Sequence, residues 1–196
     1  MIIKNIVIGG GGMMSYALLG ALDVLHEAGD LDDVEGFAGA SAGAFISVVL
    51  ALGLTPRQIC DIVQTGSNMP QLIQINDPSC ILKTGCVLQS QPLRDLLNKV
   101  LDKFPNVKTL EDIRLLYGKN VTIVATDFIT GKPMYFTCDN TVNINVIDLL
   151  ICSASLPMIF EPTEITYNDG TKKKYWDGMV SDPLPVQLFP RVLFLV

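Results

Sequence analysis

The sequence is poor in the residues that usually bind zinc or activate a catalytic serine. Its 196 residues include one histidine, His26, and five cysteines that form no C-x-x-C pair. Because a zinc ion needs several closely spaced histidine, cysteine or carboxylate ligands, we expect no metal site and no cofactor. An odd number of unpaired cysteines is typical of reduced thiols, which favours an intracellular, cytoplasmic protein.

Charge is also scarce, and the net charge is acidic. Charged residues make up 17% of the chain and the net charge is -6, so we expect no nucleic-acid partner. The longest apolar run, residues 45–54, is too short to cross a bilayer. The first twelve residues hold one lysine and a short apolar run broken by four glycines, which predicts a strand and a loop rather than a signal peptide. We therefore expect no transmembrane segment and only transient, peripheral contact with membrane surfaces.

The order of apolar and turn-forming segments predicts a single α/β domain over residues 1–196. Residues 5–8 are typical of a buried parallel strand, and residues 16–27 have the periodicity of a helix, with Ser15 as a candidate N-cap. In the first half of the chain we further expect a strand at 34–38, a helix at 42–54, and a helix that begins at Pro56 within a Thr55 capping box. A long surface loop or lid follows at 66–85, and then an amphipathic helix at 93–104 that packs on the sheet. In the second half we expect hairpins at 121–136 and 165–176, a helix at 146–153 and a strand at 192–196.

The pattern centres on Gly39-Ala40-Ser41-Ala42-Gly43, a G-x-S-x-G motif between an expected strand and an expected helix. A serine at such a corner is lifted out of the backbone with its hydroxyl exposed, and the tight turn requires glycines beside it. The following helix directs its N-terminal amides and positive dipole end at the same point, where they favour a developing negative charge. The pattern favours Ser41 as a nucleophile; the alternative is a turn in which Ser41 is only a helix N-cap.

The base for this serine is not expected to be a histidine. His26 lies before Ser41, whereas a hydrolase of Ser…Asp…His order needs a histidine after the serine. His26 is better explained as a residue near the C-terminal end of the first helix, where a cation is tolerated. We therefore expect a carboxylate, and two aspartates follow predicted strands, Asp127 and Asp177. Spacing favours Asp177 only slightly, because Gly178 allows close backbone approach while Asp127 could equally cap a turn.

A run of four glycines follows the first expected strand. The amides of Gly10, Gly11, Gly12 and Met13 can form a concave nest of donors for an oxyanion. The alternative is a nucleotide-phosphate loop, and it fits less well. A P-loop requires a lysine followed by serine or threonine, and a dinucleotide motif requires glycine where Ser15 stands.

Taken in order, four stretches of the sequence resemble the patatin-like phospholipase family, the patatin-type lipid acyl hydrolases. Together they cover nearly the whole chain. The first extends from Gly10-Gly11-Gly12-Met13-Met14-Ser15 to Gly20-Ala21-Leu22, and the second is Gly39-Ala40-Ser41-Ala42-Gly43-Ala44. The third is Ala125-Thr126-Asp127 with Thr130-Gly131, and the fourth extends from Ser153-Ala154-Ser155-Leu156-Pro157 to Asp177-Gly178-Met179 and Pro185. Each motif alone is weak, whereas the four in this order form a specific signature.

The resemblance implies a three-layer α/β sandwich with a mostly parallel central sheet flanked by helices. It also implies a Ser-Asp dyad, with Ser41 as nucleophile and Asp177 as base, and an oxyanion hole made by the glycine-loop amides. The implied reaction is calcium-independent hydrolysis of acyl esters in phospholipids or other acyl lipids, through an acyl-enzyme. The choice of Asp177 over Asp127 thus comes from the resemblance and not from the spacing.

Departures from the family's usual pattern occur at two places. Met14 and Ser15 stand where the family usually has a basic residue and then glycine, and Met179 stands where a second glycine often follows Gly178. Met14 removes a cation near the oxyanion loop, and Ser15 restricts the backbone there. Two alternatives therefore remain open: a catalytically weak module that binds lipid or a protein partner, and a soluble esterase or thioesterase.

Overall fold

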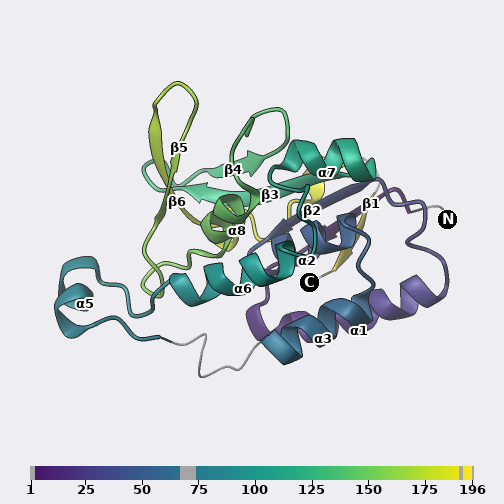
Figure 1. The fold of residues 1–196 in the computed structure, drawn as a ribbon, viewed down its shortest axis with the longest axis horizontal. Helices are drawn as coiled ribbons and strands as arrows, with labels where there is room; N and C mark the ends of the chain where they lie inside the picture. The colour runs from purple at the N-terminus through teal and green to yellow at the C-terminus, as the bar shows by residue number, and fades with distance from the viewer. Residues whose placement is uncertain (1–2, 67–73, 190–191, 196) are drawn as a thin grey trace.

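One mixed sheet forms the centre of the molecule (Figure 1). The computed structural model describes residues 3–66, 74–189 and 192–195, so residues 67–73 of the predicted loop lie outside the described residues. The strands are β1 (Asn5–Ile8), β2 (Gly36–Ala40), β3 (Asn120–Asp127), β4 (Pro133–Phe136), β5 (Thr163–Thr166), β6 (Lys172–Asp177) and β7 (Leu193–Leu195). Their order is β5-β6-β3-β2-β1-β7, with β4 paired to β3 beside this path.

Strands β7, β1, β2 and β3 run parallel to one another. In β1 the side chains of Ile6, Val7 and Ile8 are all fully buried, and every residue of β2 is buried as well. A parallel strand that is covered on both faces needs apolar or small residues at consecutive positions, which explains the unbroken apolar run in this part of the sequence.

Helices cover one face of this sheet. The helical segments are η1 (Gly12–Met14), α1 (Ser15–Glu27), α2 (Ala42–Ala51), α3 (Pro56–Gly66), α5 (Pro78–Thr84), α6 (Gln91–Leu101), α7 (Leu110–Tyr117), α8 (Val146–Ala154), η2 (Gly178–Val180) and η3 (Val186–Leu188). Helix α2 rests on β1, β2 and β3, and α8 rests on β3 and β6. Helix α1 packs against α3, while the short α5 projects from the body of the molecule (Figure 1). Apolar side chains of the helices join Phe37, Val121 and Ile123 of the sheet in one core cluster.

The opposite face of β2 is covered by the chain that follows β6. Gly36 and Ala40 share this face because side chains alternate along a strand. A Cβ atom on Gly36 would lie 3.1 Å from the ring of Phe189, and a Cβ atom on Gly178 would lie 3.1 Å from the Cβ atom of Ala40. The predicted fold class, an α/β fold with a central sheet flanked by helices, is confirmed. The sheet is mixed rather than mostly parallel, because β4, β5 and β6 join it through antiparallel pairs.

Both predicted hairpins are present. Strand β3 pairs antiparallel with β4, with Ile123 opposite Phe136, and β5 pairs antiparallel with β6, with Thr166 opposite Lys172. The turn of the second hairpin uses Gly170 with φ of +81°, a conformation that glycine adopts without steric cost.

The predicted capping box at the start of α3 is also present. The amide of Gln58 donates to Thr55 Oγ1 at 3.3 Å, and the amide of Thr55 donates to Gln58 Oε1 at 2.9 Å. These two bonds satisfy backbone donors that an uncapped helix would leave unpaired.

The prediction of a long loop after α3 is wrong where α5 forms. Asp77 caps α5 by accepting a backbone hydrogen bond at 3.0 Å, Pro78 begins it, and Gly85 ends it with φ of +72°. These residues are ordinary helix boundary signals. The helix has 7 residues, so no apolar periodicity reveals it in the sequence.

Two other helices differ from the prediction. Ser15 is the first residue of α1 and not its N-cap, because η1 runs directly into the helix and the amide of Met14 donates to the carbonyl of Gly11 at 2.9 Å. Helix α6 packs chiefly against α8 rather than on the sheet, and Leu93 and Leu97 line a cavity.

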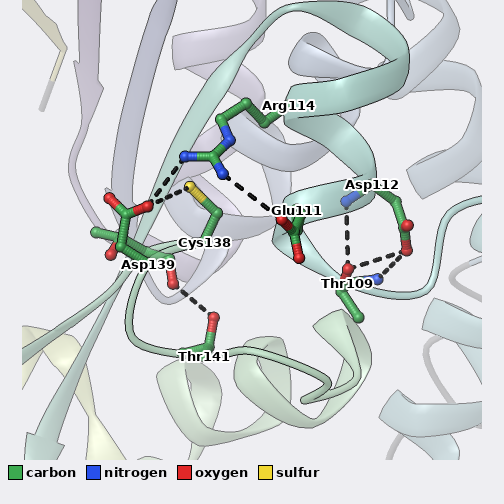
Figure 2. Close-up of polar contacts among 8 residues, drawn as sticks. Thr109, Glu111, Asp112, Arg114, Cys138, Asp139 and Thr141 are labelled. Atoms are coloured by element: carbon green, nitrogen blue, oxygen red, sulfur yellow. Dashed lines mark hydrogen bonds and ion pairs between the residues drawn. The ribbon is translucent and has the colours of Figure 1, made fainter.

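Helix α7 is tied to the chain beyond β4 by polar contacts (Figure 2). Thr109 Oγ1 accepts from the amide of Asp112 at 3.2 Å, and Asp112 Oδ2 accepts from the amide of Thr109 at 2.8 Å, which completes a second capping box. From the same helix, Arg114 forms an ion pair with Asp139 at 3.0 Å. These contacts fix the start of α7 and join it to the β4 side of the sheet.

We expect Thr109→Ala to lower the free energy of unfolding by about 1 kcal/mol, because it removes a helix N-cap. Urea denaturation measures this difference. Thr65→Ala is the matched control: its hydroxyl donates to carbonyls of its own helix, those of Asp61 at 2.6 Å and Ile62 at 3.5 Å, and the change should stay within about 0.5 kcal/mol. Equal stability of the two variants would contradict the role given to the cap.

Candidate active site

Ser41 occupies a strained turn between β2 and α2. Its backbone has φ of 54° and ψ of -124°, a combination that residues other than glycine rarely adopt, and its side chain makes no capping hydrogen bond to α2. A serine that serves as an N-cap gains stability from such a bond. The observed geometry therefore disfavours the N-cap alternative and matches a nucleophile elbow, where strain is retained because function requires it.

Glycines beside Ser41 are required by close backbone contacts. A Cβ atom on Gly39 would lie 2.4 Å from the carbonyl of Gly43. A Cβ atom on Gly43 would lie 2.2 Å from the carbonyl oxygen of Ile8 and 2.5 Å from that of Gly9. Backbone atoms of a packed strand cannot move aside as a flexible side chain can, so α2 approaches β1 this closely only without side chains at these positions.

Asp177 reaches Ser41 because two strands share one edge of β3. At Val124 and Ala125 of β3, one edge of the strand is paired with β4. Strands β2 and β6 therefore both pair with the opposite edge of β3. On the shared edge, Ala40 of β2 lies opposite Val124, and Asp177 of β6 lies opposite Ala125. Strand β2 runs parallel to β3 and β6 runs antiparallel to it, so the two strands end facing each other. Ser41, the residue after β2, therefore meets Asp177, the last residue of β6.

The C-terminal end of α8 holds both of these residues. Ser153 Oγ accepts a hydrogen bond from the amide of Ser41 at 2.8 Å and donates to the carbonyl of Val124 at 2.6 Å. The carbonyl of Ser155 accepts from the amide of Asp177 at 2.8 Å. These two roles could not be predicted from the sequence, because a buried serine near a helix end carries no local signal of its distant partners.

The carboxyl group of Asp177 is almost fully removed from water, at 1% exposure. Its Oδ1 accepts from the amide of Met179 at 2.8 Å, whereas Oδ2 has no hydrogen-bond partner within the described residues. Burial raises the pKa of Asp177 to about 6, against the opposing effects of the Met179 amide and the nearby Ser41 hydroxyl. The Ser41 hydroxyl is thus close enough to influence the carboxyl, while Oδ2 still lacks a well-formed hydrogen bond.

Asp127, the other candidate, has a different environment. Its Oδ1 accepts from the amides of Ile129 and Thr130, at 3.1 and 2.7 Å, and from the hydroxyl of Thr130 at 2.9 Å. The backbone hydrogen bond from Thr130 is the main reason that the pKa of Asp127 is lowered. Asp127 therefore caps the turn between β3 and β4, the alternative that spacing left open.

The glycine loop after β1 presents free backbone donors. The amide of Gly10 donates to the carbonyl of Pro183 at 3.4 Å. Within the described residues, the amides of Gly11 and Gly12 have no such acceptor. A Cβ atom on Gly10 would lie 3.2 Å from the Cβ atom of Ser41, so the loop passes directly beside the serine. Of the amides expected to hold an oxyanion, that of Gly10 is bonded to Pro183, and those of Gly11 and Gly12 remain available.

A cavity of about 790 Å³ joins these groups. Ser41, Asp177 and residues 10–12 line it together with Ser15. The rest of its lining is mostly apolar and includes Leu19, Phe45, Leu93, Leu97, Leu150 and Phe160. A few polar groups at one place in an otherwise apolar cavity are typical of a site for a ligand with a long apolar part and one polar group.

Neither a metal cluster nor a membrane span is found in the described parts of the chain. Within residues 3–66, 74–189 and 192–195, no three histidine, cysteine, aspartate or glutamate side chains are grouped so that they could hold a metal ion. None of the helices there combines the length and the apolar character needed to cross a bilayer.

Comparison with protein families gives a match over most of the chain. The sequence model described as patatin-like phospholipase matches residues 6–190, from β1 to beyond η3. The chain belongs to the patatin-like phospholipase family. The match includes the elbow, the glycine loop and the end of β6.

Relatives of this patatin-like chain are distant and longer than it is. An uncharacterized NTE family protein of Mycobacterium tuberculosis is 27% identical over 184 residues, which are 92% of this chain and 44% of the relative. A probable lipid hydrolase of invertebrate iridescent virus 6 is 26% identical over 188 residues, 94% of this chain and 62% of the relative. The chain thus spans about half the length of these relatives.

Solved structures share the patatin-like fold. VipD from Legionella pneumophila aligns with a TM-score of 0.68 over 99% of this chain and 49% of its own, at 18% identity. ExoU from Pseudomonas aeruginosa, in its complex with SpcU, aligns with a TM-score of 0.53 over 80% of this chain and 39% of its own, at 19% identity. At these identities the likeness concerns the fold alone.

We expect Gly43→Ala to lower the free energy of unfolding by about 1–3 kcal/mol, because the new methyl group overlaps backbone carbonyls of β1. Gly20→Ala is the control: its Cβ atom would meet nothing within 4 Å in α1, so the change should add about 0.4–1 kcal/mol. Denaturation in urea measures both. A Gly43→Ala protein as stable as the Gly20→Ala protein would contradict the described contact of α2 with β1.

Proposed function

We propose that this chain is a lipid acyl hydrolase of the phospholipase A type, which cleaves fatty-acyl esters of glycerophospholipids or glycerolipids. The observation that carries the proposal is that the strained Ser41 and the buried carboxyl of Asp177 line one apolar cavity. Family membership and the name of the viral relative, a probable lipid hydrolase, support the same class of reaction.

In the proposed mechanism Asp177 is the base and Ser41 is the nucleophile. As Ser41 Oγ attacks the ester carbonyl carbon, its proton passes to Asp177 Oδ2, the oxygen that has no partner among the described residues. A carboxylate with an ordinary pKa is a weak base for serine, and burial raises the pKa of Asp177 to about 6, closer to that of an imidazole. The raised pKa therefore supports a base that needs no histidine.

The negative charge on the carbonyl oxygen is proposed to face the amides of Gly11, Gly12 and Met13. The N-terminal end of α2, which begins at Ala42, adds the positive end of its dipole. Removal of one donor of this kind typically costs about 2.7–4 kcal/mol in transition-state stabilisation. The amide of Gly10 is given no part, because it donates to Pro183.

Collapse of the tetrahedral intermediate breaks the bond to the alcohol, which takes the proton held by Asp177. The acyl group then remains as an ester on Ser41 Oγ. Water enters the place of the alcohol, loses a proton to Asp177 and attacks the acyl carbon, so the fatty acid leaves and Ser41 recovers its proton. Each proton moves through the same carboxyl, and the catalytic step needs no other titratable group.

Apolar walls favour a long acyl chain over a small substrate. The cavity of about 790 Å³ falls in the range of small-molecule sites, roughly 300–1,000 Å³. Leucine and phenylalanine side chains offer no hydrogen bonds to a polar head group, so we assign the cavity to the fatty-acyl part of the ester.

Turnover on phosphatidylcholine vesicles well above that on a short-chain soluble ester would agree with this assignment, and the reverse preference would favour the soluble esterase.

We expect Ser41→Ala and Asp177→Asn each to reduce ester hydrolysis by at least about 10³-fold, because each removes a member of the proposed dyad. Wild-type protein should be labelled at Ser41 by a fluorophosphonate, and peptide mass spectrometry locates the label. Asp127→Asn is the matched control and should keep its activity, because that carboxyl caps a turn. Full activity of Asp177→Asn would contradict the Ser-Asp dyad. The absence of labelling in the wild type, with lipid binding retained in Ser41→Ala, would favour a lipid-binding module instead.

Activity should also depend on the ionisation of Asp177. With its pKa raised to about 6, kcat/KM should be constant above about pH 7 and fall tenfold per pH unit well below 6, because protonated Asp177 cannot act as a base. An acid limb near pH 4 would contradict the burial of this carboxyl.

Stability should change in the opposite direction over the same range. The folded chain holds the proton of Asp177 at pH values where the unfolded chain, with an ordinary pKa of 3.8, has lost it. The contribution of this group to the free energy of unfolding therefore falls as the pH rises from about 4 to about 6. Asp177→Asn should remove that contribution, which urea denaturation at pH 5 and pH 8 measures.

A further inference from the structure

Three buried side-chain atoms lack a hydrogen-bond partner in the described part of the chain: Ser15 Oγ, Ser47 Oγ and Asp177 Oδ2. Buried polar groups are nearly always hydrogen-bonded, so each exception calls for an explanation. Ser15 and Asp177 line the same cavity as Ser41, whereas Ser47 is not among the described residues of that lining. The proposed mechanism gives Asp177 Oδ2 a partner, and Ser15 has none so far.

Ser15 lies at the end of the cavity where the glycine loop enters α1. It is 8% exposed and is the first residue of this 13-residue helix. A Cβ atom placed on Gly11 would lie 3.8 Å from the Oγ atom of Ser15 and 3.8 Å from its amide nitrogen. The hydroxyl therefore adjoins the unpaired amides of the loop, and the N-terminal end of α1 makes the surroundings favourable for negative charge.

We propose that Ser15 is a further donor of the oxyanion hole, whose hydroxyl donates a hydrogen bond to the ester carbonyl oxygen as negative charge develops there. This inference rests on the proposed function. These two unpaired atoms are themselves buried, although their residues line the cavity. They need opposite partners, since a hydroxyl can donate and an ionised carboxylate can only accept. An ester supplies an acceptor to Ser15, and the hydroxyl of Ser41 supplies a donor to Asp177.

This donor is a feature of the present chain rather than of the family pattern, which usually has glycine at the position of Ser15 and a basic residue at that of Met14. Met14 cannot donate a hydrogen bond or carry a charge. The hydroxyl of Ser15 adds a neutral donor beside the same loop. The chain thus stabilises the oxyanion with one side-chain hydroxyl in addition to the backbone amides.

The test compares Ser15→Ala with Ser47→Ala, which removes a buried, unpaired hydroxyl that the described cavity lining does not include. The readouts are kcat and KM on a soluble fluorogenic ester and on phosphatidylcholine vesicles, together with the thermal midpoint of unfolding. We expect Ser15→Ala to lower kcat by about 10²-fold with KM changed less than about threefold, because the contact forms only in the transition state. Its thermal midpoint should not fall, since the hydroxyl has no partner to lose. Ser47→Ala should keep the kcat of the wild type.

An unchanged kcat in Ser15→Ala would overturn the proposal, as would a raised KM with kcat unchanged, which marks a contact with the bound substrate alone. A lowered thermal midpoint with unchanged kcat would assign the hydroxyl to the fold and would overturn it too. If the wild type hydrolyses ester and Ser41→Ala does not, these results concern Ser15 only. If the wild type neither hydrolyses ester nor reacts with a fluorophosphonate, the proposed function fails and the role of Ser15 fails with it.

Discussion

The arrangement of the candidate site depends on a single edge of β3, along which a parallel strand and an antiparallel strand follow one another. Strand β2 pairs with Val124 and β6 pairs with Ala125, so the two strands end face to face. Hydrogen bonding in the sheet thereby brings the residue after β2, Ser41, beside the last residue of β6, Asp177. The strand register of β2 and β6 on β3 sets how closely Ser41 and Asp177 approach each other. Their approach therefore does not depend on a long or adaptable loop.

The same arrangement has a stability cost, and helix α8 offsets part of it. Ser41 has a backbone conformation that is unfavourable for serine, and Asp177 has a carboxyl group that is nearly removed from water. Ser153 bonds the amide of Ser41 to the backbone of β3, and Ser155 accepts from the amide of Asp177. One helix end therefore holds both the strained Ser41 and the buried Asp177 against the sheet. Local strain that is held by surrounding contacts in this way is characteristic of functional sites.

Local patterns predict the nucleophile but not the whole site. The role of Ser41 can be predicted from the five residues of the G-x-S-x-G motif, because the strand before it and the helix after it are adjacent in the sequence. The choice of Asp177 over Asp127 as the base depends on pairing between strands that are far apart in the chain. Spacing in the sequence therefore could not decide between the two aspartates, and only the family resemblance did. Ser153 was missed because its two partners come from other elements. The hairpins and the α3 cap were predictable, because their bonds join near neighbours, while α5 was too short to leave a periodic signal.

The most direct test of this account is a crystal structure of the chain after reaction with a phosphonate ester. The account predicts a covalent bond from phosphorus to Ser41 Oγ, an Asp177 carboxyl oxygen within about 2.6–3.2 Å of that Oγ, and a phosphonyl oxygen within about 2.7–3.1 Å of the Gly11, Gly12 or Met13 amides. A phosphonate bonded elsewhere, or one on Ser41 with Asp177 turned away into separate contacts, would contradict it.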